Sequence, residues 1–221
     1  MRGISVKIAL GAAAAALVVS AAPSQARHHR TYSSEFSAKA KVSAYCTTCH
    51  GPGAHGFSGY RPIPQLAGQS AEYIKIQLGY FAEGHRQRNL WYIKYAKVHG
   101  VSPESREALG QYLASLTPIS HRSGSSDLVA AGDKLYHSGA PDHDVPACAV
   151  CHGPEAKGDG IFPRLAGQTR PYLTGQLIGW DKQRGLGPEG KDDNSQIMAP
   201  IAKSLTKEDI RAVTAYLSSL R

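Results

Sequence analysis

The sequence carries the pentad Cys-x-x-Cys-His twice, at residues 46–50 and 148–152. This pentad is the attachment sequence of c-type haem: two thiols form thioethers with the haem vinyl groups, and the adjacent His binds the iron. The two pentads use all four cysteines of the protein, and Gly-Pro follows each copy. We therefore predict two haem c groups, held by Cys46, Cys49, Cys148 and Cys151, with His50 and His152 as proximal iron ligands.

Cys-x-x-Cys also occurs in thiol–disulfide exchange proteins and in zinc sites. A zinc site needs a further pair of ligands at regular spacing, and a thioredoxin-like site needs a strand before the cysteines within a βαβ pattern. The sequence has neither feature. Two short disulfides, or one shared metal ion, are the alternatives to two covalent haems.

The iron of an electron carrier commonly has a second axial ligand, which is often Met. The sequence has two methionines, and Met1 is the initiator. Met198 lies in the polar, Pro-containing segment 194–200, which we expect to form a loop before the final helix. We predict Met198 as the distal ligand of the second haem; the alternative is that Met198 fills the core.

The first half of the chain has no methionine after its pentad. Alignment of the last helices of the two halves places Lys94 opposite Met198. Lys94 is therefore the predicted distal ligand of the first haem, and His99 is its alternative. A lysine ligand must lose its proton, which burial beside ferric iron favours. His85, a nearby Tyr and an open position are the further alternatives.

The sequence around the pentads is duplicated. The pentads are 102 residues apart, and the block Leu-Ala-Gly-Gln recurs after 99 residues, at 66–69 and 165–168. The ending Tyr-Leu-x-Ser-Leu recurs after 104 residues. We predict two units, residues 34–118 and 127–221, joined by a linker at 119–126.

Each unit has the pattern of three helices with long loops. Strand patterns are absent from the sequence, so the predicted fold class is all-α. In the last helix of the second unit the apolar residues share one face: Ile210, Val213, Leu217 and Leu220. The expected N-caps are hydroxyl residues at helix starts: Ser34, Ser70, Ser102, Thr169 and Thr206. Pro103 suits the first position of its helix, and Asp209 completes a capping box.

Residues 1–26 have the features of a secretory signal peptide. Arg2 and Lys7 form a positive start, and residues 8–19 are apolar but too short for a typical membrane span. Ser24-Gln25-Ala26 suits cleavage by a signal peptidase. An uncleaved anchor is the alternative. We expect export to the periplasm, an oxidising compartment in which haem attachment removes four otherwise unpaired thiols.

The formal net charge of +8 falls to +6 without Arg2 and Lys7, and four haem propionates lower it further. This balance is compatible with acidic protein partners and with a peripheral position at an anionic membrane surface. The sequence has no Lys/Arg run and no nucleic-acid-binding motif, which argues against a nucleic-acid partner.

The pentads, the Pro-x-Leu-Ala-Gly-Gln blocks, the Met198 segment and the Tyr-Leu-x-Ser-Leu endings resemble the tandem dihaem class I cytochromes c, the cytochrome c4 family. The resemblance covers most of residues 34–221 and implies two helical class I cytochrome c domains related by a pseudo-twofold axis. It implies that the carbonyls of Pro64 and Pro163 accept hydrogen bonds from the proximal histidines. It further implies electron transfer in the periplasm from a bc1-type complex or a dehydrogenase toward a terminal oxidase.

The leading hypothesis is an electron carrier without substrate chemistry of its own. A nitrogen or oxygen ligand should lower the potential of the first haem relative to the Met-ligated haem. We therefore expect electrons to enter at the Cys46/Cys49 haem and to leave from the Cys148/Cys151 haem.

Two other functions are the alternatives. One is a dihaem enzyme of the peroxidase or thiosulfate dehydrogenase type, with the first haem as an open substrate site. The other is the haem subunit of an oxidoreductase. Against the enzyme, no cysteine remains to serve as a sulfur ligand, and no acid–base cluster lies beside either pentad in the sequence.

Overall fold

The computed structural model describes residues 37–59, 62–83, 86, 101–122, 124–180, 184 and 195–221. In these residues the regular structure is helical, and extended pairing is limited to three isolated bridges. The all-α prediction is therefore confirmed. No helix in this part of the chain combines the length and apolarity that a membrane crossing requires. The predicted signal peptide lies outside the described residues, as do Ser34, His85, Lys94 and His99.

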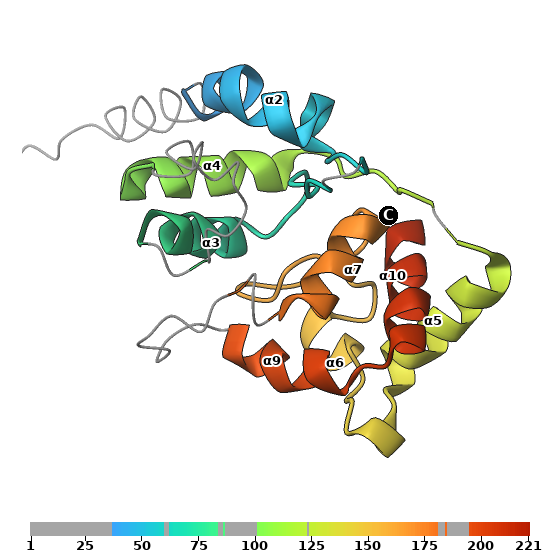
Figure 1. Ribbon diagram of the computed structural model, residues 1–221. Helices are drawn as coiled ribbons and strands as arrows, with labels where there is room; N and C mark the ends of the chain where they lie inside the picture. Colours follow the sequence, from blue (N-terminus) through green and yellow to red (C-terminus); the bar gives the residue numbers. More distant parts are fainter. Residues whose placement is uncertain are drawn as a thin grey trace, which may run out of the picture.

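In the first unit the pentad lies at the end of a helical segment, which is already helical at residue 37. Its elements are η1 (Val42–Cys46, a π-helical turn), α2 (Thr47–His50), η2 (Pro52–Ala54), α3 (Ala71–Glu83) and α4 (Pro103–Ser115). Helices α3 and α4 pack side by side (Figure 1). Gly110 allows this approach, because a Cβ there would lie 2.5 Å from the carbonyl oxygen of Ala71. The buried apolar core is small: Ala38, Val42, Ala54, Ile74, Leu109 and Leu113.

The second unit is built around its last helix. Its elements are α5 (Ser126–Ser138), η4 (Pro141–His143), α6 (Ala149–His152), α7 (Arg170–Ile178), α9 (Ser195–Ser204) and α10 (Lys207–Ser219). Helix α10 packs against α5 and α7, and a Cβ at Gly132 would lie 2.1 Å from the carbonyl oxygen of Ala212. The buried core combines α5, α7 and α10 with the loops: Leu135, Tyr136, Ala156, Ala166, Leu173, Val213, Tyr216 and Leu217.

The apolar face predicted for the last helix is confirmed. Ile210, Val213 and Leu217 are buried, and Leu220 is partly buried against the same core.

The predicted helix starts are mostly confirmed. Ser70 accepts a hydrogen bond from the N–H of Tyr73, Ser102 accepts one from Ser105, and Pro103 opens α4. Thr206 and Asp209 form the predicted capping box at the start of α10. The prediction for Thr169 is wrong in one respect: the residue stands at the N-cap position, but its side chain makes no capping hydrogen bond.

The prediction that Met198 lies in a loop is wrong. Met198 lies within α9, a ten-residue helix that contains Pro200. The second unit therefore has more helices than the three expected, because α6 and α9 are helices in their own right. The prediction depended on Pro200, because an internal proline removes a helical hydrogen bond and usually ends a helix. Here α9 continues through Pro200 to Ser204.

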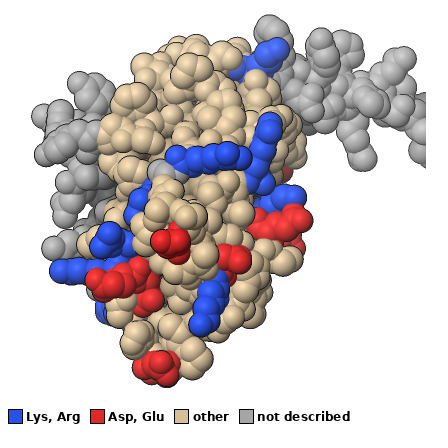
Figure 2. Space-filling model, turned by 90° about the vertical axis from the view of Figure 1, so that its right-hand side faces the viewer, with Lys and Arg blue, Asp and Glu red and all other residues tan. Residues whose placement is uncertain are grey.

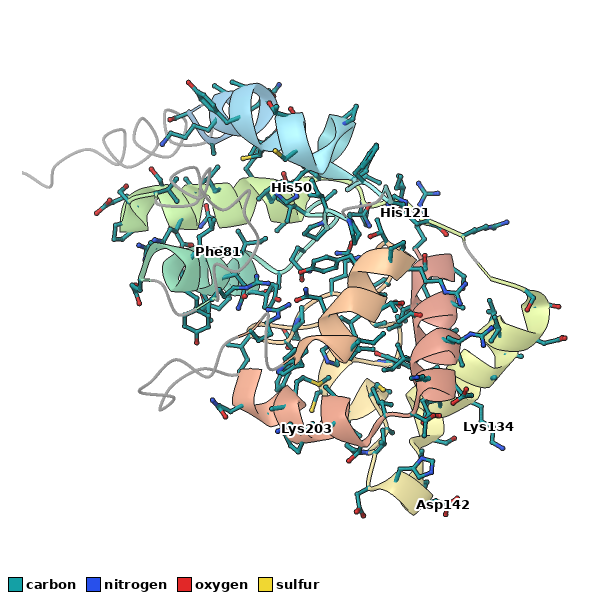
Figure 3. All side chains as sticks on the ribbon, viewed as in Figure 1. His50, Phe81, His121, Lys134, Asp142 and Lys203 are labelled. Atoms are coloured by element: carbon teal, nitrogen blue, oxygen red, sulfur yellow. The ribbon has the colours of Figure 1, made fainter. Side chains whose placement is uncertain are left out.

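The two units are stacked on one another, and the chain between them runs along one side of the molecule (Figure 1). His121 lies at this junction (Figure 3) and is bonded to both units. Its Nε2 is 2.7 Å from the carbonyl oxygen of His55, and its backbone N–H donates to Ser218. The linker is thus fixed to the protein around His121. The unit bounds 34–118 and 127–221 stay predictions.

Charged side chains of both signs are interspersed on the face that Figure 2 shows, and no field of one sign covers it. This face, at the right of Figure 1, includes α5.

Candidate haem sites

Each pentad forms one helical turn. Cys46 ends η1 and Cys148 is the N-cap of α6, so the second cysteine and the histidine of each pentad follow three and four residues later along the helix. Side chains at this spacing share one face of a helix. Two thiols and one imidazole are therefore presented together at each site, as covalent attachment of one haem requires.

The four thiols are free, which argues against the disulfide alternative. Burial raises the pKa of Cys148 to about 11 and also raises that of Cys46, so both stay protonated, unlike a redox-active or zinc-binding thiolate. Among the described residues, no group of three or more His, Cys, Asp and Glu side chains could hold a metal ion. A shared zinc site built from these residues is therefore not supported.

Each histidine of a pentad is fixed by a backbone carbonyl, as the family resemblance implied. His50 Nδ1 lies 2.9 Å from the carbonyl oxygen of Pro64, and His152 Nδ1 lies 3.0 Å from that of Pro163. A carbonyl oxygen only accepts, so Nδ1 carries the proton and donates it, and Nε2 keeps its lone pair. Nε2 is the atom that can bind iron.

Burial keeps these imidazoles neutral. His152 is 6% exposed, and His50, at the end of α2, is half-buried (Figure 3). Burial lowers the pKa of both side chains, and the hydrogen bond to the proline carbonyl opposes this shift. A neutral imidazole is the form that binds a metal.

A repeated loop after each pentad positions the histidine against the proline segment. The motif Gly-Pro-x-Ala-x-Gly follows both pentads, at residues 51–56 and 153–158. Its last glycine donates its N–H to the histidine carbonyl, at 2.7 Å for His50 and 2.9 Å for His152. Its alanine carbonyl accepts from the leucine of the Leu-Ala-Gly-Gln block, at 2.8 Å in both units.

The importance of this loop was not predicted from the sequence, although its motif occurs twice. Ala54 and Ala156 have positive φ values of 59° and 55° and are both fully buried. At Gly158, a Cβ would lie 2.4 Å from the carbonyl oxygen of Phe162. Small residues are therefore required at these positions.

The structure does not test the predicted distal iron ligands. Met198 is half-buried in α9, which packs against α7. Its role as an iron ligand stays a prediction. Lys94 and its alternatives His99 and His85 lie outside the described residues, so their role stays a prediction too.

Two arginines meet at the junction of the units, one after α3 and one after α7. The side-chain oxygen of Gln77 accepts hydrogen bonds from Arg86 at 3.0 Å and from Arg184 at 2.9 Å. The side-chain oxygen of Gln176 accepts hydrogen bonds from Arg184 at 2.8 Å and from Arg86 at 3.5 Å. Gln77 and Gln176 occupy equivalent positions in the sequence repeat, so the cluster follows the pseudo-symmetry of the chain.

This cluster suits the carboxylates of haem. Burial, and then the positive charge of Arg184, lower the pKa of Arg86. The Nε atom of Arg86 is buried and has no hydrogen-bond partner among the described residues. Buried cations are stable when an anion compensates them. Each haem c has two propionates, and guanidinium groups pair well with carboxylates. The paired thiols, the neutral imidazoles and the arginine cluster together fit two haem c groups.

Comparison with known proteins agrees with this geometry. The cytochrome c family model matches residues 129–221. The chain is 33% identical over 178 residues to the thiosulfate dehydrogenase electron acceptor of Stutzerimonas stutzeri, covering 79% of this chain and 78% of that protein. It is 31% identical over 189 residues to cytochrome c4 of Azotobacter vinelandii, covering 80% and 85%.

The fold also matches a solved structure. The crystal structure of reduced recombinant cytochrome c4 from Pseudomonas stutzeri superposes with a TM-score of 0.70 at 28% identity, over 85% of this chain and 98% of that one. The expectation of two tandem cytochrome c domains is therefore confirmed, and redox proteins are the partners that such a protein implies. The chain belongs to the cytochrome c4 family of tandem dihaem class I cytochromes, which transfer electrons by means of two haem c groups.

Proposed function

We propose that this protein carries single electrons between redox proteins of the periplasm and has no substrate chemistry of its own. Cys46 and Cys49 would hold the first haem with His50 as proximal ligand. Cys148 and Cys151 would hold the second with His152 as proximal ligand. Met198 would be the distal ligand of the second haem. Lys94, or alternatively His99, would be the distal ligand of the first.

The observation that carries this proposal is the pair of histidine–proline hydrogen bonds. They put both imidazoles in the same tautomer and fix the plane of each ring. When bound, haem c supplies a one-electron iron couple. The role of the chain is to hold each neutral imidazole in one orientation and to shield it from water.

A dehydrogenase that oxidises thiosulfate is the donor that we propose. The support is the name of a relative, the thiosulfate dehydrogenase electron acceptor of Stutzerimonas stutzeri. A bc1-type complex is the alternative donor, and a terminal oxidase is the proposed acceptor. Mixing the reduced dehydrogenase with the ferric protein in a stopped-flow spectrometer tests the donor: rapid haem reduction that saturates with dehydrogenase concentration supports it.

The proposed periplasmic location requires export, which we assign to residues 1–26, and we expect this segment to be removed. N-terminal sequencing of protein from the periplasmic fraction should begin at Arg27. Retention of the segment in a membrane fraction would support the anchor alternative. Intact-mass measurement of the same sample should give the mature chain plus two haem groups, and a mass without them would contradict the proposal.

The second candidate function is a dihaem enzyme that uses the first haem as an open site. The absence of Met from the first half of the mature sequence favours it. Spectra of the ferric protein with cyanide and of the ferrous protein with carbon monoxide separate the two functions. Two low-spin haems that bind neither ligand rapidly support the carrier. Rapid binding at one haem, together with thiosulfate oxidation by the protein alone, would support the enzyme.

A further inference from the structure

The peptide groups that accept the histidine hydrogen bonds are themselves held by the other domain. The carbonyl that faces His50 belongs to the peptide between Pro64 and Gln65. The N–H of this same peptide donates to Oε1 of Gln168, in the second domain, at 2.8 Å. Nε2 of Gln168 donates to the carbonyl of Gln65 at 3.0 Å, so both ends of the amide are bonded.

The second histidine has the mirror arrangement. The carbonyl that faces His152 belongs to the peptide between Pro163 and Arg164. The N–H of this peptide donates to Oε1 of Gln69, in the first domain, at 2.6 Å. Nε2 of Gln69 donates to the carbonyl of Arg164 at 3.0 Å.

Both glutamines are held in one orientation. Gln69 and Gln168 are each 6% exposed. Each Oε1 also accepts the N–H of the next residue, at 3.1 Å from Ser70 and at 2.9 Å from Thr169. Because Oε1 meets only N–H donors and Nε2 meets a carbonyl, the amides cannot be flipped without losing these bonds.

A hydrogen bond to the N–H of a peptide increases the negative charge on its carbonyl oxygen. Chains of hydrogen bonds strengthen one another in this way, by roughly 10–30% per bond. The carbonyl then accepts more strongly from Nδ1 of the histidine. Partners behind a metal-binding histidine raise its basicity as a ligand and so tune the metal.

We propose that Gln69 and Gln168 are positioning residues that act across the domain interface. Gln168 supports His50 of the first domain, and Gln69 supports His152 of the second, so the potential of each haem depends on the docking of the other domain. The proposal rests on the proposed ligand roles of His50 and His152.

The test replaces each glutamine by leucine in the haem-loaded full-length protein. Gln168→Leu removes the side-chain oxygen that accepts the N–H of the peptide between Pro64 and Gln65. The Pro64 carbonyl then accepts less strongly from Nδ1 of His50, so His50 becomes a weaker electron donor to the iron. The potential of the first haem should therefore rise. The second haem should shift less. Gln69→Leu should give the reverse pattern. The potentials are followed haem by haem, through paramagnetic NMR signals during a redox titration.

Gln65→Leu is the matched control. The Gln65 side chain is buried in the same interface and takes part in three hydrogen bonds with the backbone of Ile119 and Gly167, but it does not bond either peptide behind a histidine. Gln65→Leu should loosen the interface without a larger shift in potential at the haem of the other domain.

Gln168→Glu is a second control. It keeps an oxygen that can accept the N–H of the peptide between Pro64 and Gln65, so the potential of the first haem should not rise.

Equal shifts at both haems, or a larger shift at the haem of the mutated domain, would overturn the proposal. If Gln168→Leu does not fold, Gln69→Leu carries the same test in mirror form. A second readout is the exchange rate of the Nδ1 proton, which should increase at His50 in Gln168→Leu. A separate experiment shows whether His50 is an iron ligand at all. If His50 does not bind the iron, a His50→Ala protein keeps the wild-type visible spectrum.

Discussion

The hydroxyl group of Tyr136 donates a hydrogen bond to the carbonyl oxygen of Gly153, with an O–O distance of 2.5 Å. Tyr136 lies in α5 and is fully buried, and Gly153 directly follows His152. The bond therefore ties α5 to the end of the helix that presents the second proximal histidine. Because Gly153 also accepts the N–H of Ala156, Tyr136→Phe does not leave its carbonyl without a partner. We expect a loss of about 1 kcal/mol in the free energy of unfolding, measured by guanidinium denaturation. An unchanged free energy would contradict this role.

The stability of the second domain should fall at high pH. Burial raises the pKa of Tyr216 to about 12 and raises that of Tyr136 further. In the unfolded chain a tyrosine loses its proton near pH 10. Above that pH the unfolded state holds fewer protons than the folded state, so the free energy of unfolding decreases as pH rises. Urea denaturation between pH 8 and about 11 should show this decrease, and Tyr136→Phe should reduce its slope. A slope unaffected by the substitution would count against the buried tyrosine as its source.

The capping box at the start of α10 should contribute measurably to stability. Thr206 Oγ1 accepts the N–H of Asp209 at 3.1 Å, and Asp209 Oδ2 accepts the N–H of Thr206 at 3.0 Å. Thr206→Ala removes the first of these bonds and should cost about 1 kcal/mol. Ser102→Ala is the control, because Ser102 accepts the N–H of Ser105 at the start of α4 without forming a capping box, and it should cost less. Equal losses in thermal or denaturant unfolding would show that the box adds nothing to a single cap.

Removal of the Thr169 hydroxyl should not destabilise the protein, in contrast to removal of the Thr206 hydroxyl. Its hydroxyl oxygen is buried and has no hydrogen-bond partner among the described residues, and the residue is 0% exposed. Thr169→Val keeps the shape and removes the unsatisfied group, so the free energy of unfolding should stay the same or rise by about 1 kcal/mol. A clear loss of stability would indicate a partner for this hydroxyl, such as a buried water.

Thr169 also shows where sequence interpretation stops. A hydroxyl residue at the start of a helix is a sound prediction of an N-cap, and the position was correct. Pro171 occupies the second helical position and has no N–H, which removes one of the two donors that a cap can serve. The N–H of Thr169 itself donates to Oε1 of Gln168, and the role of Gln168 depends on the fold as a whole.

Local and repeated features were predictable, and contacts across the interface were not. The two pentads, the helix caps and the apolar face of α10 depend on residues a few positions apart. The family resemblance supplied the bonds from His50 and His152 to the proline carbonyls. The glutamines of the two Leu-Ala-Gly-Gln blocks were recognised as a repeat. Their partners are about 100 residues away in the sequence, so no local pattern reveals that each block binds the other domain.

The two haems should have well-separated potentials. We expect Met198 to ligate the second haem through a thioether, which favours ferrous iron, whereas Lys94 or His99 gives the first haem a ligand that favours ferric iron. A spectroelectrochemical titration should therefore resolve two one-electron steps, the lower at the Cys46/Cys49 haem. Two haems of equal potential would contradict both the ligand difference and the proposed direction of electron flow.

Substitution of the predicted distal ligands then assigns each step. Met198→Ala should lower the higher potential and convert one haem to a high-spin or cyanide-binding form, without affecting the lower step. Lys94→Ala should change the spin state of the other haem only, because the two sites are in separate domains. His99→Ala is the matched comparison: if it alone changes the first haem, His99 is the ligand, and Lys94 is excluded. Met198→Leu separates ligation from packing, because leucine fills a similar volume but cannot bind iron. If Met198→Leu retains the wild-type potential, Met198 has only a packing role in α9.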